Sequence, residues 1–183
     1  MASHCRARRL SLASLGIVAA LLPGCVGIDS FLVKTEAPPT GRPCQIVATW
    51  NKEVVFAPDP ANGGKPTPGL TGRLYLFGPQ IDFPLAGKGS LKVELYRVDA
   101  PADGSPADVR TKLLEEWRID KETLSRLLRK DTIGWGYSLF LPWGTYKPEI
   151  NHVRLKVCYD PGDGGAPLYT ESLTVTLTKA RGG

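Results

Sequence analysis

The side chains that could carry catalysis are few in this sequence. It has two histidines, and because His4 lies in the N-terminal leader described below, His152 is the one imidazole left for a folded domain. His152 stands alone on the polar parity of a predicted strand, which argues against a Ser-His-Asp triad, and one histidine cannot make a histidine-rich zinc site. The chain also has no Gly-x-Ser-x-Gly elbow, no phosphate-binding glycine motif and no Cys-x-x-Cys pair. We therefore expect a protein that is not an enzyme and holds no cofactor or metal.

Acidic side chains occur in two arrangements of interest. Glu115 and Glu116 are adjacent in a predicted strand, so they point to opposite faces and cannot share a site. Asp160 and Asp163 lie in a glycine-rich loop that could bind calcium through oxygen ligands, although turn formation explains the same residues. An unusual enzyme site would need a deep polar pocket that gathers several of four aspartates, Asp59, Asp82, Asp160 and Asp163.

The aromatic side chains are the best candidates for ligand binding. If they are exposed and coplanar, the four tryptophans could stack on sugars; they are Trp50, Trp117, Trp135 and Trp143. The alternative is that these large rings fill the core of a small domain. Trp135 and Trp143 share one strand parity with Leu139 and Leu141, which favours the core.

The N-terminus has the pattern of a secretory signal. Arg6, Arg8 and Arg9 precede an apolar run from Leu10 to Leu22, and no acidic residue occurs before Asp29. A helix that spans a bilayer needs about 20 apolar residues, so this run is too short for a comfortable permanent anchor. We expect residues 1–24 to direct export and then to be removed.

The run ends in Leu22-Pro23-Gly24-Cys25, which resembles the lipobox of bacterial lipoproteins. The resemblance implies cleavage after Gly24, a diacylglyceryl group on the Cys25 thiol and an acyl chain such as palmitate on the new amino terminus. One acyl chain binds a membrane only marginally, whereas two or three anchor firmly. Val26 stands where an aspartate would favour the inner membrane, so we expect the periplasmic side of the outer membrane in a diderm cell. The alternative is an ordinary signal followed by an incidental cysteine.

Removal of the leader changes both the charge and the cysteine count. Three arginines leave from 23 basic residues, so 20 remain against 18 acidic residues. This balance, with no long basic patch, argues against a nucleic-acid partner. Cys44 and Cys158 remain for the domain, in a compartment that permits disulfides. These two cysteines either form a disulfide or remain free thiols.

The mature chain divides into a tether and one domain. Residues 25–44 contain the predicted lipid site and then Pro38, Pro39 and Pro43, which is typical of a semi-extended tether. Residues 45–179 are rich in β-branched and aromatic residues and in glycine and proline turns.

Period-two alternation predicts strands along the domain. It is clearest in residues 90–98, 135–143, 153–159 and 173–178, where apolar and polar residues alternate. The same pattern places His152 on a solvent face. One helix is predicted from an Asp120 cap, with a stripe of Leu124, Leu127 and Leu128 and with Arg126, Arg129 and Lys130 toward its end. We expect a mostly β protein, an immunoglobulin-like antiparallel β-sandwich of about seven strands with one short helix; a small barrel is the second choice.

Three stretches resemble an uncharacterised family of bacterial exported proteins, namely residues 48–51, 72–78 and 135–143. This resemblance implies a recurring module and no particular activity. Together with the leader, it leads us to expect a lipid-anchored, non-enzymatic binding or structural module of the cell envelope. Its partners would be membrane lipid and either an envelope protein or a surface polysaccharide. The alternative function is a carbohydrate-binding module or an accessory to a polysaccharide-processing enzyme.

Overall fold

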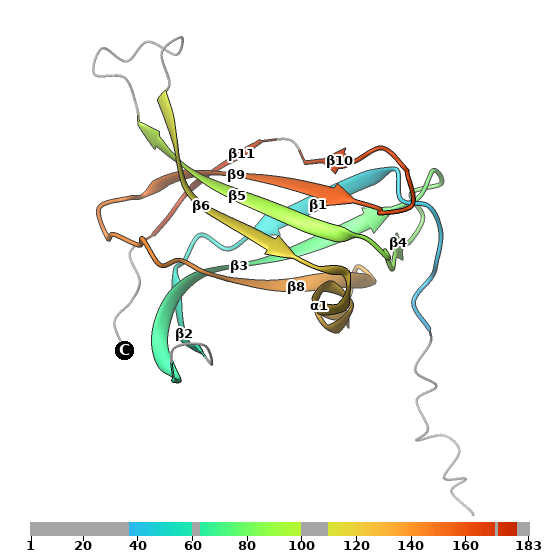
Figure 1. The fold of residues 1–183 in the computed structure, drawn as a ribbon, viewed down its shortest axis with the longest axis horizontal. Coiled ribbons are helices and arrows are strands. Elements are labelled where there is room, and N and C mark those ends of the chain that lie inside the picture. The colour runs from blue at the N-terminus through green and yellow to red at the C-terminus, as the bar shows by residue number, and fades with distance from the viewer. Residues whose placement is uncertain (1–36, 60–62, 100–109, 171, 179–183) are drawn as a thin grey trace, which may run out of the picture. The chain divides into compact units, whose positions relative to one another are not determined.

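The fold is a two-layer antiparallel β-sandwich with one short helix (Figure 1). It is seen in a computed structural model that describes residues 37–59, 63–99, 110–170 and 172–178. The predicted signal and Cys25 lie outside these residues. The two open sheets confirm the predicted sandwich and not the barrel.

The first sheet contains six strands and forms one layer. They are β1 (Gln45–Trp50), β2 (Val55–Asp59), β3 (Lys65–Phe77), β4 (Pro84–Leu85), β7 (Leu128–Lys130) and β8 (Trp135–Pro142). The order of the main path is β1-β3-β8-β7, and the short strands β2 and β4 pair with β3. The long strand β3 therefore supports four neighbours.

The second sheet contains five strands and forms the facing layer. They are β5 (Ser90–Asp99), β6 (Arg110–Ile119), β9 (His152–Asp160), β10 (Leu168–Tyr169) and β11 (Leu173–Thr176). The order is β10-β9-β5-β6, with β11 also paired to β9. A register shift between Leu95 and Tyr96 interrupts the β5–β6 ladder. The predicted number of about seven strands omitted short strands that lack a readable alternation.

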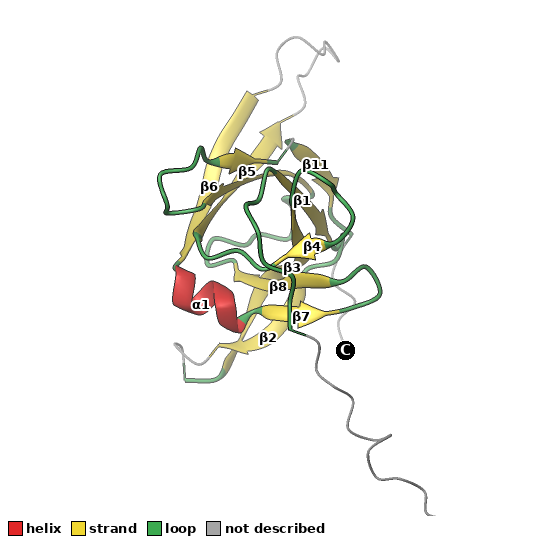
Figure 2. Ribbon diagram, turned by 90° about the vertical axis from the view of Figure 1, so that its right-hand side faces the viewer, coloured by secondary structure: helices red, strands yellow, loops and turns green. Residues whose placement is uncertain are grey.

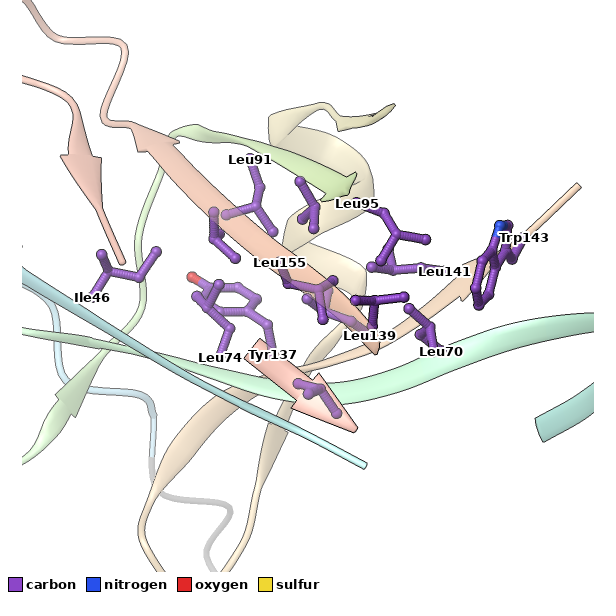
Figure 3. Close-up of a cluster of buried hydrophobic side chains, with 14 of the residues drawn as sticks. Ile46, Leu70, Leu74, Leu91, Leu95, Tyr137, Leu139, Leu141, Trp143 and Leu155 are labelled. Carbon is purple, nitrogen blue, oxygen red and sulfur yellow. The ribbon is translucent and has the colours of Figure 1, made fainter. Parts of the chain in front are cut away.

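The inward faces of the two sheets form one hydrophobic core (Figure 3). On β9 the buried side chains alternate with exposed or half-buried ones, as the period of two predicts. Leu74 and Tyr137, cross-strand partners in the first sheet, belong to the same buried cluster as Leu155 of the second. Burying one such side chain contributes about 1.5–3 kcal/mol. The core is thus the main source of stability.

The prolines near residue 66 lie in a strand, although the glycine and proline content of residues 59–69 would favour a turn-rich loop. Strand β3 begins at Lys65, and Pro66 and Pro68 pair with Pro58 and Phe56 of β2. Residues 65–68 pair with β2 alone, because the ladder to β8 begins at Gly69. Proline is tolerated where one side of a strand is open.

Helix α1 (Lys121–Arg126) begins as predicted and ends earlier. The Asp120 carboxylate accepts a hydrogen bond from the Thr123 amide at 2.7 Å, which confirms the cap. Leu124 is buried, as the apolar stripe predicts. Residues 128–130 form β7 beside β8 instead of a last helical turn. So short a helix has few internal hydrogen bonds, and the pairing with β8 outweighs its extension.

Two buried tyrosine hydroxyls hold the connection between the sheets. Tyr137 Oη accepts a hydrogen bond from the Gly87 amide at 2.7 Å, and Tyr159 Oη accepts one from the Gly89 amide at 2.9 Å. A Cβ at Gly87 would lie 2.3 Å from Tyr159 Oη, so only glycine fits there. The segment from β4 to β5 is thereby fixed to both layers.

Replacing Tyr137 by Phe leaves the Gly87 amide without its acceptor, so urea titration is expected to show a loss of about 1–3 kcal/mol of unfolding free energy. The exposed control Tyr169→Phe is expected to change the unfolding free energy by less than about 0.5 kcal/mol.

Burial raises the pKa of Tyr137 to about 12, above the value near 10 expected in an unfolded chain. The wild type therefore loses stability as the pH rises from about 10 to 12, and Tyr137→Phe loses less. An identical alkaline dependence in both proteins would contradict this role.

Candidate functional site at one end of the sandwich

The four tryptophans do not form an exposed platform. Trp143 is fully buried in the core, at 0% exposure. Trp50 and Trp117 are half-buried and pack against the same core, and the indole nitrogen of Trp117 donates to the Pro142 carbonyl at 2.8 Å. Trp135 is also half-buried. The structure therefore favours the core interpretation of these rings over a sugar-stacking surface.

His152, Glu115 and Glu116, the single side chains considered for catalysis, each have different hydrogen-bonding partners. His152 is exposed, as predicted, with its ring nitrogen 3.4 Å from Thr176 Oγ1. Glu115 accepts a hydrogen bond from the Thr145 amide, whereas Glu116 pairs with Arg118 at 2.7 Å. The two glutamates thus have separate partners, as their adjacent positions imply.

The three aspartates whose side chains the structure describes, Asp82, Asp160 and Asp163, do not gather in one pocket. Asp82 lines an open groove of about 430 Å³, and Asp163 lines a separate hollow of about 340 Å³. The carboxylates of Asp160 and Asp163 accept hydrogen bonds from the amides of Gly162 and Gly165, which is turn formation. The side chain of Asp59 lies outside the described residues. Within the described ranges, no three His, Cys, Asp or Glu side chains are grouped so that they could hold a metal ion.

Cys44 and Cys158 are free thiols in the structure. Cys44 donates its amide to the Phe77 carbonyl at 2.8 Å, at the edge of the first sheet. Cys158 lies on β9 of the second sheet and pairs with Tyr169 and Lys92 on the neighbouring strands.

Charged side chains on the outer face of the second sheet satisfy one another. Glu94 accepts hydrogen bonds from Lys92 at 2.7 Å and from the Tyr96 hydroxyl at 2.9 Å. Lys156 lies over the Tyr96 ring at 5.1 Å. The hydrogen bond from Lys92 is the largest cause that lowers the pKa of Glu94. On this face the charged side chains are therefore paired with one another.

A polar cluster on the outer face of the first sheet is the most connected set of side chains that sequence reasoning missed. The Arg73 guanidinium forms an ion pair with Asp131 at 2.5 Å and also donates to Ser138 Oγ. The Tyr75 hydroxyl donates to the same Asp131 oxygen at 2.7 Å. Arg73 and Tyr75 project outward from β3, and Asp131 follows β7. We name these four residues the Asp131 cluster.

The Asp131 carboxylate shapes the turn that follows it. Its second oxygen accepts hydrogen bonds from the amides of Ile133 at 2.9 Å and Gly134 at 3.1 Å. Burial alone would raise the pKa of Asp131, but the hydrogen bonds from Tyr75, Gly134 and Ile133 and the Arg73 charge together lower it. The carboxylate is thus held ionised as a structural acceptor, and it positions residues 131–134.

The same turn meets the β4 strand. A Cβ built on Gly134 would lie 2.9 Å from Pro84 Cδ, so the turn 131–134 contacts the start of β4. The N-terminal segment joins this region, because the Ala86 amide donates to the Pro39 carbonyl at 2.8 Å and Thr40 forms a bridge with Ala86. Residues 37–44 of the predicted tether therefore lie along the domain. Figure 2 looks onto this end of the sandwich.

We define the β4 end as the segment 37–43, the loop 78–83 and the turn 131–134. The open groove of about 430 Å³ runs between residues 39–42 and the loop 78–83. Apolar residues at this end project into solvent from two separate loops. Sequence reasoning missed this feature because Ile81, Phe83 and Ile133 lie outside the alternating strands, where apolar residues carry no periodic signal.

These features define an antiparallel two-sheet β-sandwich protein with a candidate interaction surface at its β4 end. No protein-family model matches the chain, and no curated protein matches it. Among solved structures it is similar to the crystal structure of MtrC from Shewanella baltica OS185, at 10% identity and a TM-score of 0.40. The match covers 75% of this chain and 23% of that chain. This chain therefore spans about a quarter of that protein, and so distant a likeness carries no functional argument.

The described residues contain no helix that is both long and apolar enough to cross a membrane.

Acrylamide quenching tests the placement of the tryptophans. Because Trp143 is in the core and the other three are half-buried, we expect much slower quenching in the folded chain than in urea, and no change in emission when a soluble polysaccharide is added. Quenching at the unfolded rate in the folded chain would contradict this placement.

Replacing Asp131 by Asn tests the cluster. Loss of the charged hydrogen bonds is expected to reduce the unfolding free energy at pH 7 by about 1–2 kcal/mol, whereas Asp99→Asn, in the exposed Arg97 pair, changes it little. The lowered pKa of Asp131 in the folded state means that its contribution is present above about pH 4 and lost as the pH falls through the folded-state value. The wild type and Asp131→Asn should therefore converge in acid; a constant difference down to pH 2 would contradict the assignment.

Proposed function

We propose that this chain is a lipid-anchored, non-enzymatic binding or structural module of the bacterial cell envelope. One observation carries the proposal: the apolar run of the leader ends in register at the lipobox cysteine, Cys25. A described, folded segment then begins at Ala37. The leader would direct export of the chain, the lipid would retain it at the membrane, and the sandwich domain would bind the partner.

The geometry of the polar groups supports a binding or structural role. Arg73 and Asp131, the best-connected charged pair on the first sheet, direct their hydrogen bonds to neighbouring side chains and to a turn. Glu94 and Lys92 do the same on the second sheet. These groups stabilise surfaces and shape a loop, which suits a rigid module whose partners are the membrane and an envelope protein or polysaccharide.

The location follows from the same residues. Val26 after the lipidated cysteine favours the periplasmic side of the outer membrane in a diderm cell, under the sorting rule for bacterial lipoproteins. Binding of a polysaccharide remains the alternative function. No specific contact favours it, since none of the four tryptophans is an exposed side chain.

Metabolic labelling in a diderm bacterial host tests the anchor. We expect an alkyne analogue of palmitate to label the wild type, and globomycin to cause accumulation of the uncleaved form. Cys25→Ser should abolish the label because it removes the thiol that receives the diacylglyceryl group. Cys5→Ser, the matched control within the leader, should be labelled like the wild type. An unlabelled wild type, or equal labelling of Cys25→Ser, would refute the lipid anchor.

A further inference from the structure

Three large apolar side chains extend into solvent at the β4 end. Ile81 is 58% exposed and Phe83 is 70% exposed in the loop 78–83, and Ile133 is 57% exposed in the turn 131–134. The two loops meet where Gly134 contacts Pro84. Single exposed apolar residues are normal on a protein surface, but three of them at one end of the sandwich make this end a candidate interaction site. We call these three residues the patch.

The backbone of this patch is strained. Ile81 has a φ of 53°, the one positive value of a non-glycine residue within the described ranges. A β-branched residue in this conformation is an outlier that costs about 1–3 kcal/mol. Its amide donates to the Gly78 carbonyl at 3.1 Å, which closes the turn. The surrounding turn keeps Ile81 in this unfavourable backbone conformation. The isoleucine side chain is exposed there, so packing in the core does not explain the conformation.

The patch is held rigidly from the body of the sandwich. Phe83 is followed directly by β4, which pairs with the end of β3. Ile133 is positioned by the hydrogen bond from its amide to Asp131, a carboxylate fixed in turn by Arg73. Apolar groups that are preorganised in this way can enter a partner surface with little further loss of conformational entropy.

The N-terminal segment limits what this end can face. Roughly a dozen residues separate Cys25 from Ala37, and even a fully extended chain of that length spans only about 40 Å. Residues 39–42 line the groove beside the loop 78–83, so the described chain begins at the end of the sandwich that carries β4 (Figure 1). A lipid on Cys25 would therefore keep the start of the described chain, and the β4 end with it, within about 40 Å of the bilayer.

We propose that Ile81, Phe83 and Ile133 form a membrane-docking tip that inserts into the interfacial region of the phospholipid bilayer to which Cys25 is anchored. This inference rests on the proposed lipid anchor. Insertion is driven by the apolar side chains, because burial of exposed apolar area from water is favourable at about 25 cal/mol per Å². Charge contributes little, since Arg42 in the groove is accompanied by Asp82. The docked chain is thus held at two points, the lipid and the tip.

Quenching by spin-labelled lipids tests the docking. The full chain is expressed with its leader, purified in its processed and lipidated form, and reconstituted in vesicles of phosphatidylethanolamine and phosphatidylglycerol. With Cys44 and Cys158 replaced by Ser, a bimane probe is placed by Asp82→Cys at the tip, or by Lys112→Cys on β6 as a reference. We expect strong quenching at position 82, little at position 112, and little change in 0.5 M salt.

Two sets of variants separate docking from folding. Ile81→Asn with Phe83→Ser removes the apolar groups, and Asn tolerates the positive φ, so stability should not fall while quenching at position 82 falls about tenfold. The matched control, Leu113→Asn with Phe56→Ser, alters side chains that are 47% and 53% exposed elsewhere on the sandwich, and it should leave quenching unchanged.

The outcomes distinguish the tip from the anchor. If the chain does not incorporate into vesicles at all, the lipid-anchored function fails and the docking inference fails with it. If the chain incorporates but the probe at position 82 is no better quenched than the probe at position 112, the docking alone is refuted, and the tip instead faces solvent or a protein partner. Equal quenching in the Ile81→Asn, Phe83→Ser variant would also refute it.

Discussion

Each of the two sheets must keep its apolar face packed against the other sheet, and the remaining features of the structure depend on this constraint. The inward residues of β3, β5, β8 and β9 form one cluster, and a shift of any strand by one residue would turn its apolar face to water. The register of these strands is therefore strongly specified. Their ends are placed with them, which is how irregular loops at one end of the sandwich obtain a defined geometry.

Hydrogen bonds at the edge of the core connect the sheets to the loops near β4. Tyr137 and Tyr159 carry their rings in the core and their hydroxyls at Gly87 and Gly89. On the outer face, Asp131 joins Arg73 to the turn that contains Ile133. Together these hydrogen bonds fix the loops to the sheets, and the buried one from Gly89 to Tyr159 is the most costly to leave unmade. The strained Ile81 backbone persists because the surrounding structure holds it.

Residue patterns predict the regularly alternating strands well and the end of the sandwich poorly. The alternation in β8 and β9 and the Asp120 cap identify a sandwich with one helix, because periodicity reports burial directly. The β2–β3 hairpin is hidden by Pro66 and Pro68, whose tolerance depends on an open strand edge that only the fold reveals. The Asp131 cluster is missed because it joins residues 58 positions apart, and the exposed tip because isolated apolar residues have no pattern.

The proposed lipid anchor and the proposed apolar tip, joined by a short segment, together describe a module that stands close against a membrane. Neutron reflectometry of the lipidated chain on a supported bilayer measures this most directly, because it resolves where protein density begins relative to the lipid headgroups. The account predicts that protein density begins within the headgroup layer, with no intervening water. A solvent-filled layer between the headgroups and the domain would contradict it.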